Sequence, residues 1–357
     1  MHYASIMAGG SGTRLWPMST PDQPKQLLRF INGQSLLSTS AGRLMGLVAP
    51  ENIFVCTSNA YAEKVLDDLP FLSPDRLLGE PMGRDTLNAV GFSAAVIHKI
   101  DPQATLAILT ADHLITPVPE FQRTVMRAFE LAESMPDYLF TFGITPTFAA
   151  TGFGYLECGE AIAESARRVA AFREKPDAET AEAYFRSGRH LWNSGMFVWK
   201  TATILEQIRV HQPAAYAGLQ EIAAAYGTTG FSTKVTEIYP NLPKISIDYA
   251  IMEKAPKVAT IPMNVQWIDV GSWSSYAQTL SPDKLGNRAS NADILAVDAS
   301  GIVAVSDSRH LVAVVGLNDL VVVNSGHVTM ICPADQCEKV KSLAQAAQKA
   351  YPDGYHP

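Results

Sequence analysis

Short apolar runs alternate with longer amphipathic segments over the first 140 residues of the chain. The runs at 3–7, 53–57 and 105–110 are brief and apolar, which is typical of buried strands. The segments at 36–47 and 89–99 repeat their apolar residues at helical spacing, which predicts amphipathic helices. Because strands that alternate with helices are typical of parallel sheets, the pattern favours an α/β fold with a mostly parallel sheet flanked by helices.

The later part of the chain has a different pattern of apolar and polar residues. The pattern still predicts a helix at 121–134, a strand at 138–143 and an Ala-rich helical segment at 204–226. A polar stretch at 281–291 then predicts a linker. Beyond it we expect short apolar strands followed by a helix: 294–297, 302–305, 311–315, 320–323 and 333–350. We therefore expect a catalytic domain at 1–283 and a small C-terminal β domain at 284–357.

Composition excludes several classes of protein. The chain has 357 residues, 47% hydrophobic and 18% charged, which is enough for about two domains with a substantial core. Its net charge of −7 disfavours a broad nucleic-acid-binding surface. The N-terminus lacks the features of a signal peptide, and the apolar stretch 311–323 is short for a membrane span and contains Asn318 and Asp319. We therefore expect a cytoplasmic protein without a nucleic-acid or membrane partner.

The cysteines carry no predicted function. Cys56, Cys158, Cys332 and Cys337 show no metal-binding spacing. Free thiols, buried or incidental, are the favoured interpretation, and a redox or metal role is the alternative.

A glycine-rich stretch at 7–17, Met-Ala-Gly-Gly-Ser-Gly-Thr-Arg-Leu-Trp-Pro, follows the first expected strand. An α/β protein places its phosphate-binding turn at this point. Gly9, Gly10 and Gly12 permit backbone angles closed to other residues, so several N–H groups can converge on an anion. Arg14 adds a planar cation whose forked donors suit phosphate. The stretch predicts a polyphosphate cradle, with a structural turn as the alternative.

The same string resembles the signature G-G-x-G-T-R-L-x-P of the sugar nucleotidyltransferases. With Trp16 and the segment Pro24-Lys25-Gln26, it resembles more narrowly the mannose-1-phosphate guanylyltransferases. Further blocks similar to this family follow in family order as far as residue 273. The resemblance implies a Rossmann-like nucleotidyltransferase fold with a small β-helix-like domain after it.

Two acids are expected at strand ends. Asp112 follows the strand at 105–110, and Asp269 lies in Trp-Ile-Asp-Val-Gly-Ser-Trp at 267–273, which is similar to the family's W-x-D-V-G-S-W. Ligands of open α/β sheets bind beyond the carboxyl ends of the strands, and Mg²⁺ prefers oxygen ligands. We expect Asp112 and Asp269 to bind one or two Mg²⁺ ions, with a buried helix cap as the alternative for Asp269. His113 is either a substrate contact or a structural histidine, and we leave it outside the catalytic set.

A second loop is expected on the nucleotide side. Glu80 and Arg84 lie in a stretch that resembles the family's E-P-x-G-R-N-T-A-P-A, from which Asp85, Leu87 and Asn88 depart. The Glu80 carboxylate could accept from guanine N1–H and from the exocyclic amine, a donor pair that adenine lacks. A residue that merely precedes a proline turn is the alternative.

Lys25 completes the expected nucleotide side. Its ammonium can meet phosphate oxygens if its segment folds beneath the glycine loop; a solvated surface lysine is the alternative. The predicted nucleotide-binding residues are Ala8, Gly9, Gly10, Ser11, Gly12, Thr13, Arg14, Lys25, Glu80 and Arg84.

Three further blocks point to a sugar phosphate. Residues 151–156 resemble the family's T-G-Y-G-Y-I, and we expect Gly154 to permit close approach of a sugar face to the backbone. In the block similar to F-x-E-K-P, the resemblance implies that Glu174 binds mannose hydroxyls and Lys175 the phosphate. Asn193, in a match to W-N-S-G-x-F, can donate to and accept from sugar hydroxyls. Asp248 is interpreted as a helix cap, with a ligand role left open.

The predicted function is transfer of GMP from GTP to α-D-mannose 1-phosphate, which yields GDP-mannose and pyrophosphate. The sugar phosphate oxygen would attack the α-phosphorus in line, and no strong general base is needed because the nucleophile is already an anion. Alignment and charge neutralisation would carry catalysis. The predicted catalytic residues are Arg14, Lys25, Asp112, Lys175 and Asp269, with Mg²⁺ as cofactor.

Three alternatives remain at this level. The same chemistry could use another nucleotide or another sugar, such as heptose 1-phosphate. A non-catalytic sugar-nucleotide sensor could share the fold. A dehydrogenase is disfavoured because Leu15 stands where the dinucleotide fingerprint requires glycine. The C-terminal strands are expected to have unpaired edges. We therefore expect these strands to pack against the other domain or against another subunit, and a homodimer is one such arrangement.

Overall fold

The computed structural model describes residues 1–10, 12–31 and 33–351. They form two compact units. Unit 1 contains Met1–Gly9, Ser40–Ala111 and Ile115–Trp267. Unit 2 contains Gly10–Thr39, Asp112–Leu114 and the chain from Ile268 onward. The units are described separately, and the expected boundary between residues 283 and 284 stays a prediction.

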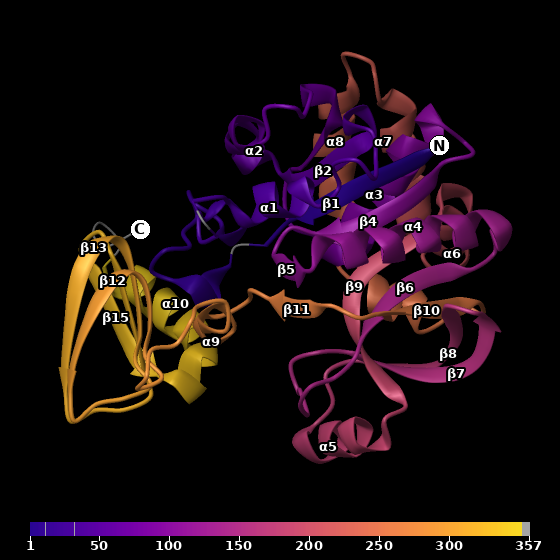
Figure 1. Ribbon diagram of the computed structural model, residues 1–357. Helices are drawn as coiled ribbons and strands as arrows, with labels where there is room; N and C mark the ends of the chain where they lie inside the picture. Colours follow the sequence, from indigo (N-terminus) through magenta and orange to yellow (C-terminus); the bar gives the residue numbers. More distant parts are fainter. Residues whose placement is uncertain (11, 32, 352–357) are drawn as a thin grey trace. The chain divides into compact units, whose positions relative to one another are not determined.

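A nine-stranded sheet forms the centre of unit 1, in the order β3-β2-β1-β4-β9-β6-β10-β8-β7 (Figure 1). Its first four strands are mutually parallel. They are β1 (His2–Ala8), β2 (Ile53–Ser58), β3 (Leu77–Glu80) and β4 (Thr105–Thr110). Their central residues are buried, because both faces of a parallel sheet are covered. The three strands predicted from the short apolar runs are therefore confirmed.

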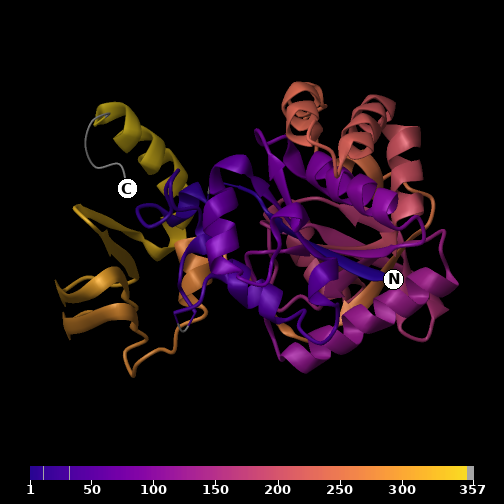
Figure 2. The same cartoon turned by 90° about the horizontal axis from the view of Figure 1, so that it is seen from above.

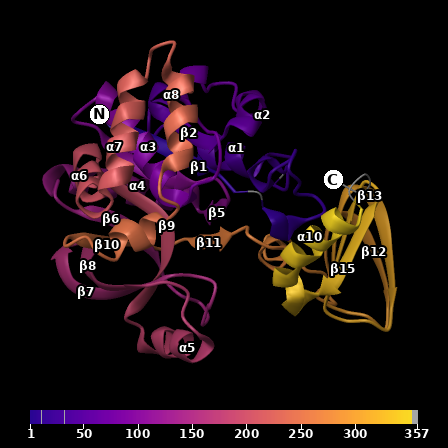
Figure 3. The ribbon, with the colours of Figure 1, turned by 180° about the vertical axis from the view of Figure 1, so that it is seen from behind.

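The other half of the sheet is mixed. β6 (Leu139–Ile144) and β10 (Val258–Met263) are parallel to each other, whereas β9 (His190–Lys200) is antiparallel to both β4 and β6. β7 (Tyr155–Ala163) and β8 (Ala166–Arg173) form an antiparallel pair at the edge (Figure 3). β9 therefore runs opposite to the strands on both of its sides, and β6 and β10 run in the same direction as β4.

Helices cover both faces of this sheet, as Figure 2 shows. α3 (Asp85–Ile100), α6 (Thr201–His211) and α7 (Pro213–Ala225) pack together, and α4 (Val118–Ser134) packs on β4, β9 and β10. The remaining helices of unit 1 are α2 (Ala62–Asp68), α5 (Ala178–Ser187) and α8 (Phe231–Ile238). α1 (Leu36–Gly42) ends earlier than the predicted 36–47.

The helical segment predicted at 204–226 is two helices rather than one. α6 ends at His211 and α7 starts at Pro213. Proline lacks the N–H that a continuing helix needs, but it suits a first helical position, where no such donor is required. The Ala-rich composition predicted helix correctly, and Pro213 divides it.

The C-terminal part of unit 2 is a four-stranded sheet in the order β12-β13-β14-β15. β12 (Arg288–Val297), β13 (Val303–Val315) and β14 (Leu320–Ser325) are parallel, and β15 (Val328–Pro333) is antiparallel to β14. The strands predicted at 302–305 and 311–315 are one strand. Val305 and His310 are consecutive partners of β12, so residues 306–309 lie between two pairs at the shift of register. This polar stretch bulges from the pairing with β12 without ending the strand.

A hydrophobic cluster joins the parts of unit 2. Trp273, in α9 (Trp273–Ala277), is fully buried, and its indole N–H donates to the Trp16 carbonyl at 2.9 Å. Phe30 packs against the rings of Trp273 and Tyr276. The final helix, α10 (Val340–Ala350), begins later than the predicted 333–350, because Ala334–Lys339 forms a 3₁₀ turn. The loop around Arg14 and the C-terminal segment therefore share one core.

Part of the C-terminal sheet remains uncovered. Leu295, Leu311, Val315 and Ile331 are each more than half exposed. Such a group of exposed aliphatic side chains is typical of interaction surfaces. The homodimer stays a prediction. Among the described residues, no helix has both the length and the apolar character that crossing a membrane would require.

Candidate active site

A lysine and an aspartate form the tightest charged pair of unit 2 among the residues that the structure describes. The Lys25 ammonium donates to Oδ2 of Asp112, and the two side chains are only 14% and 22% exposed. Burial alone would raise the pKa of Asp112, but the charges of Lys25 and His113 lower it to about 2. Burial likewise opposes the charge on Lys25, while Asp112 and Asp269 raise its pKa above the usual value. Both groups are therefore charged at neutral pH.

Gly12 allows this pair to form against the glycine loop. Its φ is +62°, and a Cβ at this position would lie 2.5 Å from the Cβ of Lys25. Any side chain at residue 12 would therefore collide with the lysine stem. The structure thus places Lys25 directly against the predicted cradle. Gly10 also has a left-handed φ of +92°, and Ser11 lies outside the described residues.

Asp269 lies close to the same pair. Asp112 follows β4, Asp269 ends β11 (Gln266–Asp269), and the Val270 N–H donates to the Asp112 carbonyl at 3.0 Å. One ligand atom from each of Asp112, His113 and Asp269 lies within 4.8 Å of the others. The two acids predicted to share a metal are thus brought together. His113, which the sequence left ambiguous, starts β5 (His113–Thr116) as the third member of this group.

Arg14 has a different partner. Its Nη1 donates to both oxygens of Glu338, at 3.1 and 3.0 Å. The side chains are 46% and 70% exposed, so solvent screens this ion pair and it contributes under about 1 kcal/mol. Lys25 and Asp112 are less exposed, so solvent screens their attraction less, although removing both charges from water offsets part of it. Arg14 can therefore exchange Glu338 for another anion at low cost.

Unit 1 carries the residues of the second nucleotide loop. Glu80 ends β3, is 7% exposed, and accepts a hydrogen bond from the Tyr239 hydroxyl at 2.5 Å through Oε1. Burial raises the pKa of Glu80, and the tyrosine bond opposes this. The other oxygen, Oε2, lies 3.6 Å from where a Cβ would stand on Gly9. The predicted Glu80 and Gly9 are therefore neighbours, and Ala8 is buried at the end of β1.

The departures from the family pattern in this loop fit the local geometry. Asp85 has a φ of +64°, a conformation that Asp and Asn tolerate better than most residues, so this replacement suits the backbone. Asn88, where the family has proline, donates to the carbonyls of Arg84 and Pro243 at 2.9 and 2.6 Å. Arg84 itself donates to the Pro240 carbonyl. The guanidinium of Arg84 is thus engaged with the protein backbone.

Residues predicted to bind the sugar lie close to one another in another part of unit 1. Lys175 donates to Oε1 of Glu174 at 2.8 Å and has a φ of +43°, which is unusual for a lysine. Backbone strain of this kind is found preferentially at functional sites. A Cβ on Gly154 would lie 2.6 Å from Oε2 of Glu174. The Glu174 carboxylate therefore lies directly against Gly154, and the approach of a sugar face to this glycine stays a prediction.

Asp248 is not a helix cap, which corrects the interpretation made from the sequence. It is the first residue of a π-helical turn, Asp248–Met252, whose cap position is Ile247. Its Oδ1 accepts from Nδ2 of Asn193 at 3.1 Å, and the Thr141 hydroxyl donates to Oδ1 of the same amide at 3.3 Å. Burial and the charge of Glu174 raise the pKa of Asp248 to about 6. Asp248 therefore orients the predicted sugar-binding amide.

The aromatic side chains near Asn193 pack into the interior. Trp192 and Trp199 are buried, and Phe153 packs edge-on against Trp192 and Trp267 at 5.1 and 4.9 Å between ring centroids. All four cysteines are free.

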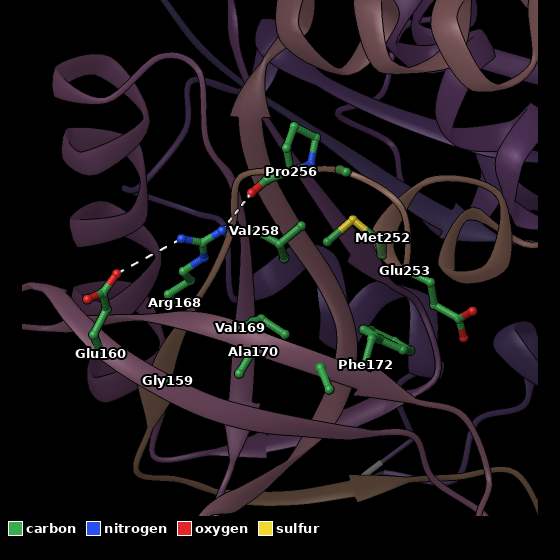
Figure 4. A pocket seen from close by; sticks show the side chains of 12 residues that line it. Gly159, Glu160, Arg168, Val169, Ala170, Phe172, Met252, Glu253, Pro256 and Val258 are labelled. Carbon is green, nitrogen blue, oxygen red and sulfur yellow. Dashed lines mark hydrogen bonds and ion pairs between the residues drawn. The ribbon is translucent and has the colours of Figure 1, made fainter.

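One hollow of about 560 Å³ lies beside the π-helical turn (Figure 4). Phe172, Met252 and Val258 form its apolar wall, and Arg168 reaches across it toward the Pro256 carbonyl. None of the predicted site residues that the structure describes lines it.

Comparison with known proteins now adds to this geometry. The model of the nucleotidyl transferase family matches residues 3–284, and that of the MannoseP isomerase/GMP-like beta-helix domain matches residues 293–346. The mannose-1-phosphate guanylyltransferases of Salmonella montevideo and Klebsiella pneumoniae are each 36% identical over 95% of this chain and 72% of their own length. The chain belongs to the mannose-1-phosphate guanylyltransferases of this family.

Solved structures agree with this family of nucleotidyltransferases. A Thermus thermophilus protein described as a mannose-1-phosphate geranyltransferase superposes with a TM-score of 0.87 at 33% identity, covering 97% of this chain and 99% of its own. A Helicobacter pylori mannose-6-phosphate isomerase, at 24% identity and a TM-score of 0.62, shares the fold over 75% of this chain and 99% of its own. The predicted nucleotidyltransferase fold with a small C-terminal β domain is confirmed.

The raised pKa of Asp248 predicts how stability depends on pH. Because its folded pKa of about 6 exceeds the ordinary value of 3.8, this carboxyl favours the folded state while protonated, and that contribution is lost as pH rises through about 6. From pH 4 to pH 7, the unfolding free energy of the wild type should fall relative to Asp248→Asn by on the order of 2 to 3 kcal/mol. Denaturant titrations across this range measure the difference, and parallel curves for the two proteins would contradict the assignment.

Proposed function

We propose that this guanylyltransferase transfers GMP from GTP to α-D-mannose 1-phosphate, with release of pyrophosphate. The main support is that the chain is similar over 95% of its length to curated mannose-1-phosphate guanylyltransferases. A close group of two acids and a lysine beside the glycine loop adds to this support. A cytoplasmic location stays a prediction.

We assign the triphosphate to the charged groups of unit 2. Backbone N–H groups of the glycine loop would meet phosphate oxygens, and Arg14 can leave its exposed pair with Glu338 for a polyanion of higher charge. Lys25 neutralises phosphate charge while it holds Asp112 in place. The predicted contacts of Ala8, Gly9, Ser11 and Thr13 belong to the same proposal.

The donors near Lys25 fit Mg²⁺. The two carboxylates have ligand atoms within 4.8 Å of each other and match a cation that takes one or two carboxylates plus phosphate and water, whereas the His113 imidazole is not a ligand that Mg²⁺ prefers. Asp112 and Asp269 would hold it, and bound Mg²⁺ would neutralise the charge that develops on the reacting phosphates. Lys25 donates to Oδ2 of Asp112 and so would hold this carboxylate in place for the metal. The low pKa of Asp112 keeps the carboxylate ionised.

We assign the base and the sugar phosphate to unit 1. Glu80 would accept from the guanine edge, and Arg84 would hold the shape of the loop beneath it. Glu174 would accept from mannose hydroxyls while Lys175 binds the phosphate, and Asn193 would donate to a further hydroxyl. Lys175 is 62% exposed and pairs with Glu174 at the surface, so it can turn toward a phosphate.

The reaction needs placement more than proton transfer. The phosphate oxygen of mannose 1-phosphate is already anionic, so it can attack the α-phosphorus of GTP directly, and pyrophosphate leaves on the opposite side. Arg14 and Lys25 would neutralise charge on the triphosphate, and Lys175 would neutralise charge on the sugar phosphate, which reduces the repulsion between the two anions. Holding both substrates in line supplies the remaining advantage.

A panel of substrates tests this proposal. Pyrophosphate release should be fastest with GTP and mannose 1-phosphate, and at least about tenfold slower in kcat/KM when ATP, UTP or dTTP replaces GTP. The same comparison with glucose 1-phosphate and heptose 1-phosphate tests the sugar. Faster turnover with another pair would assign the same chemistry to that pair, and no release with any pair would favour a non-catalytic sensor.

Substitution of Asp112 tests the assignment of the metal. Asp112→Asn keeps the shape of the side chain but removes the charge, so kcat should fall by about 100-fold or more while the circular dichroism spectrum is unchanged. Asp137→Asn is the matched control, because Asp137 is a surface acid that pairs with an exposed lysine. Turnover near the wild-type value in Asp112→Asn would refute a direct role for this carboxylate.

A further inference from the structure

Glu80 has one oxygen that is already committed to the protein. Oε1 accepts from the Tyr239 hydroxyl at 2.5 Å, whereas Oε2 lies beside the glycine at position 9. An ionised carboxylate can only accept, so the tyrosine must be the donor in this pair. The carboxylate therefore presents Oε2, rather than both oxygens equally, to a ligand near Gly9.

The Tyr239 side chain is itself closely packed in the core. It is fully buried, and its ring packs against Phe92 at 5.8 Å between centroids. The residue starts a short 3₁₀ turn, Tyr239–Asn241, which directly follows α8. A buried aromatic ring with a single polar tip is a rigid hydrogen-bond donor. The position of the Glu80 carboxylate is thus set by the hydrophobic core.

The chain after Tyr239 is fastened to the loop after Glu80. Arg84 donates to the Pro240 carbonyl, the Asn88 amide to the Pro243 carbonyl, and the Leu87 N–H to the Ile245 carbonyl at 3.2 Å. The segment that carries Tyr239 is therefore tied by three hydrogen bonds to the loop that follows Glu80.

We infer that Tyr239 is a positioning residue for base selection: its hydroxyl fixes the Glu80 carboxylate so that Oε2 accepts from an N–H donor on the Watson–Crick edge of the purine. Guanine offers N1–H and the exocyclic amine at this edge, whereas adenine presents an acceptor at N1. If adenine took this place, Oε2 of Glu80 would face the N1 acceptor, which repels it and offers no hydrogen bond. ATP is therefore disfavoured. This inference rests on the proposed function, because it takes Glu80 as the residue that reads the base.

Binding of nucleoside diphosphates tests the inference without relying on turnover. Calorimetry gives the dissociation constants of GDP, ADP and mannose 1-phosphate for the wild type and for Tyr239→Phe, which removes only the hydroxyl. The preference for GDP over ADP should fall by about tenfold, since one hydrogen bond to a charged group is lost. Affinity for mannose 1-phosphate should stay within about twofold of the wild type, because the hydroxyl acts on the base alone.

Tyr276→Phe is the matched control. Tyr276 is also fully buried, and its hydroxyl bonds to Ser290 at 2.8 Å in unit 2, so its loss should lower stability without changing base preference. Glu80→Gln should also lose preference for GDP. Because both residues act through one carboxylate, the double variant Tyr239→Phe/Glu80→Gln should lose little more than Glu80→Gln alone.

An unchanged GDP preference in Tyr239→Phe, an equal loss in Tyr276→Phe, or additive losses in the double variant would overturn the inference. If the variants give one of these results while the wild type turns over GTP and mannose 1-phosphate, the inference fails and the proposed function stands. A wild type without preference for GDP, and without pyrophosphate release from GTP and mannose 1-phosphate, would refute both.

Discussion

The ion pair between Lys25 and Asp112 sets the arrangement of the charged groups in unit 2. It forms at a place where neither residue is fully solvated, and each partner favours the charged form of the other. The lysine can reach the aspartate only because residue 12 has no side chain. The pair in turn keeps an ionised carboxylate within reach of Asp269 and His113. One constraint therefore connects the glycine loop to the two acids.

A single segment links the two substrate-related clusters of unit 1. It begins at Tyr239, which holds Glu80, and ends at Asp248, which holds Asn193. Backbone and side-chain bonds to the loop at 84–88 fasten it along its length. Neither Tyr239 nor Asp248 was assigned a ligand role from the sequence. Both belong to the structure that orients the residues with assigned roles.

The charged residues that we assign to phosphate and sugar could be proposed from motifs, because these side chains stand within short, spaced blocks. The parallel strands were predictable because buried strands are apolar runs of the right length. Tyr239 and Glu338 could not be found in this way. Each acts through a contact with a residue more than 150 positions away, and such contacts leave no local pattern. Asp248 was misread because a helix cap and a partner for Asn193 require the same residue type.

The central claim is that the acids near Lys25 bind the metal on which phosphate chemistry depends. A titration of turnover against Mg²⁺ in Asp269→Asn tests it most directly, because Asp269 is the second proposed ligand, whereas Asp112 also accepts a hydrogen bond from Lys25. The account predicts that half-maximal turnover needs at least about tenfold more Mg²⁺ than in the wild type. An unchanged Mg²⁺ requirement, with the variant folded and active, would contradict it.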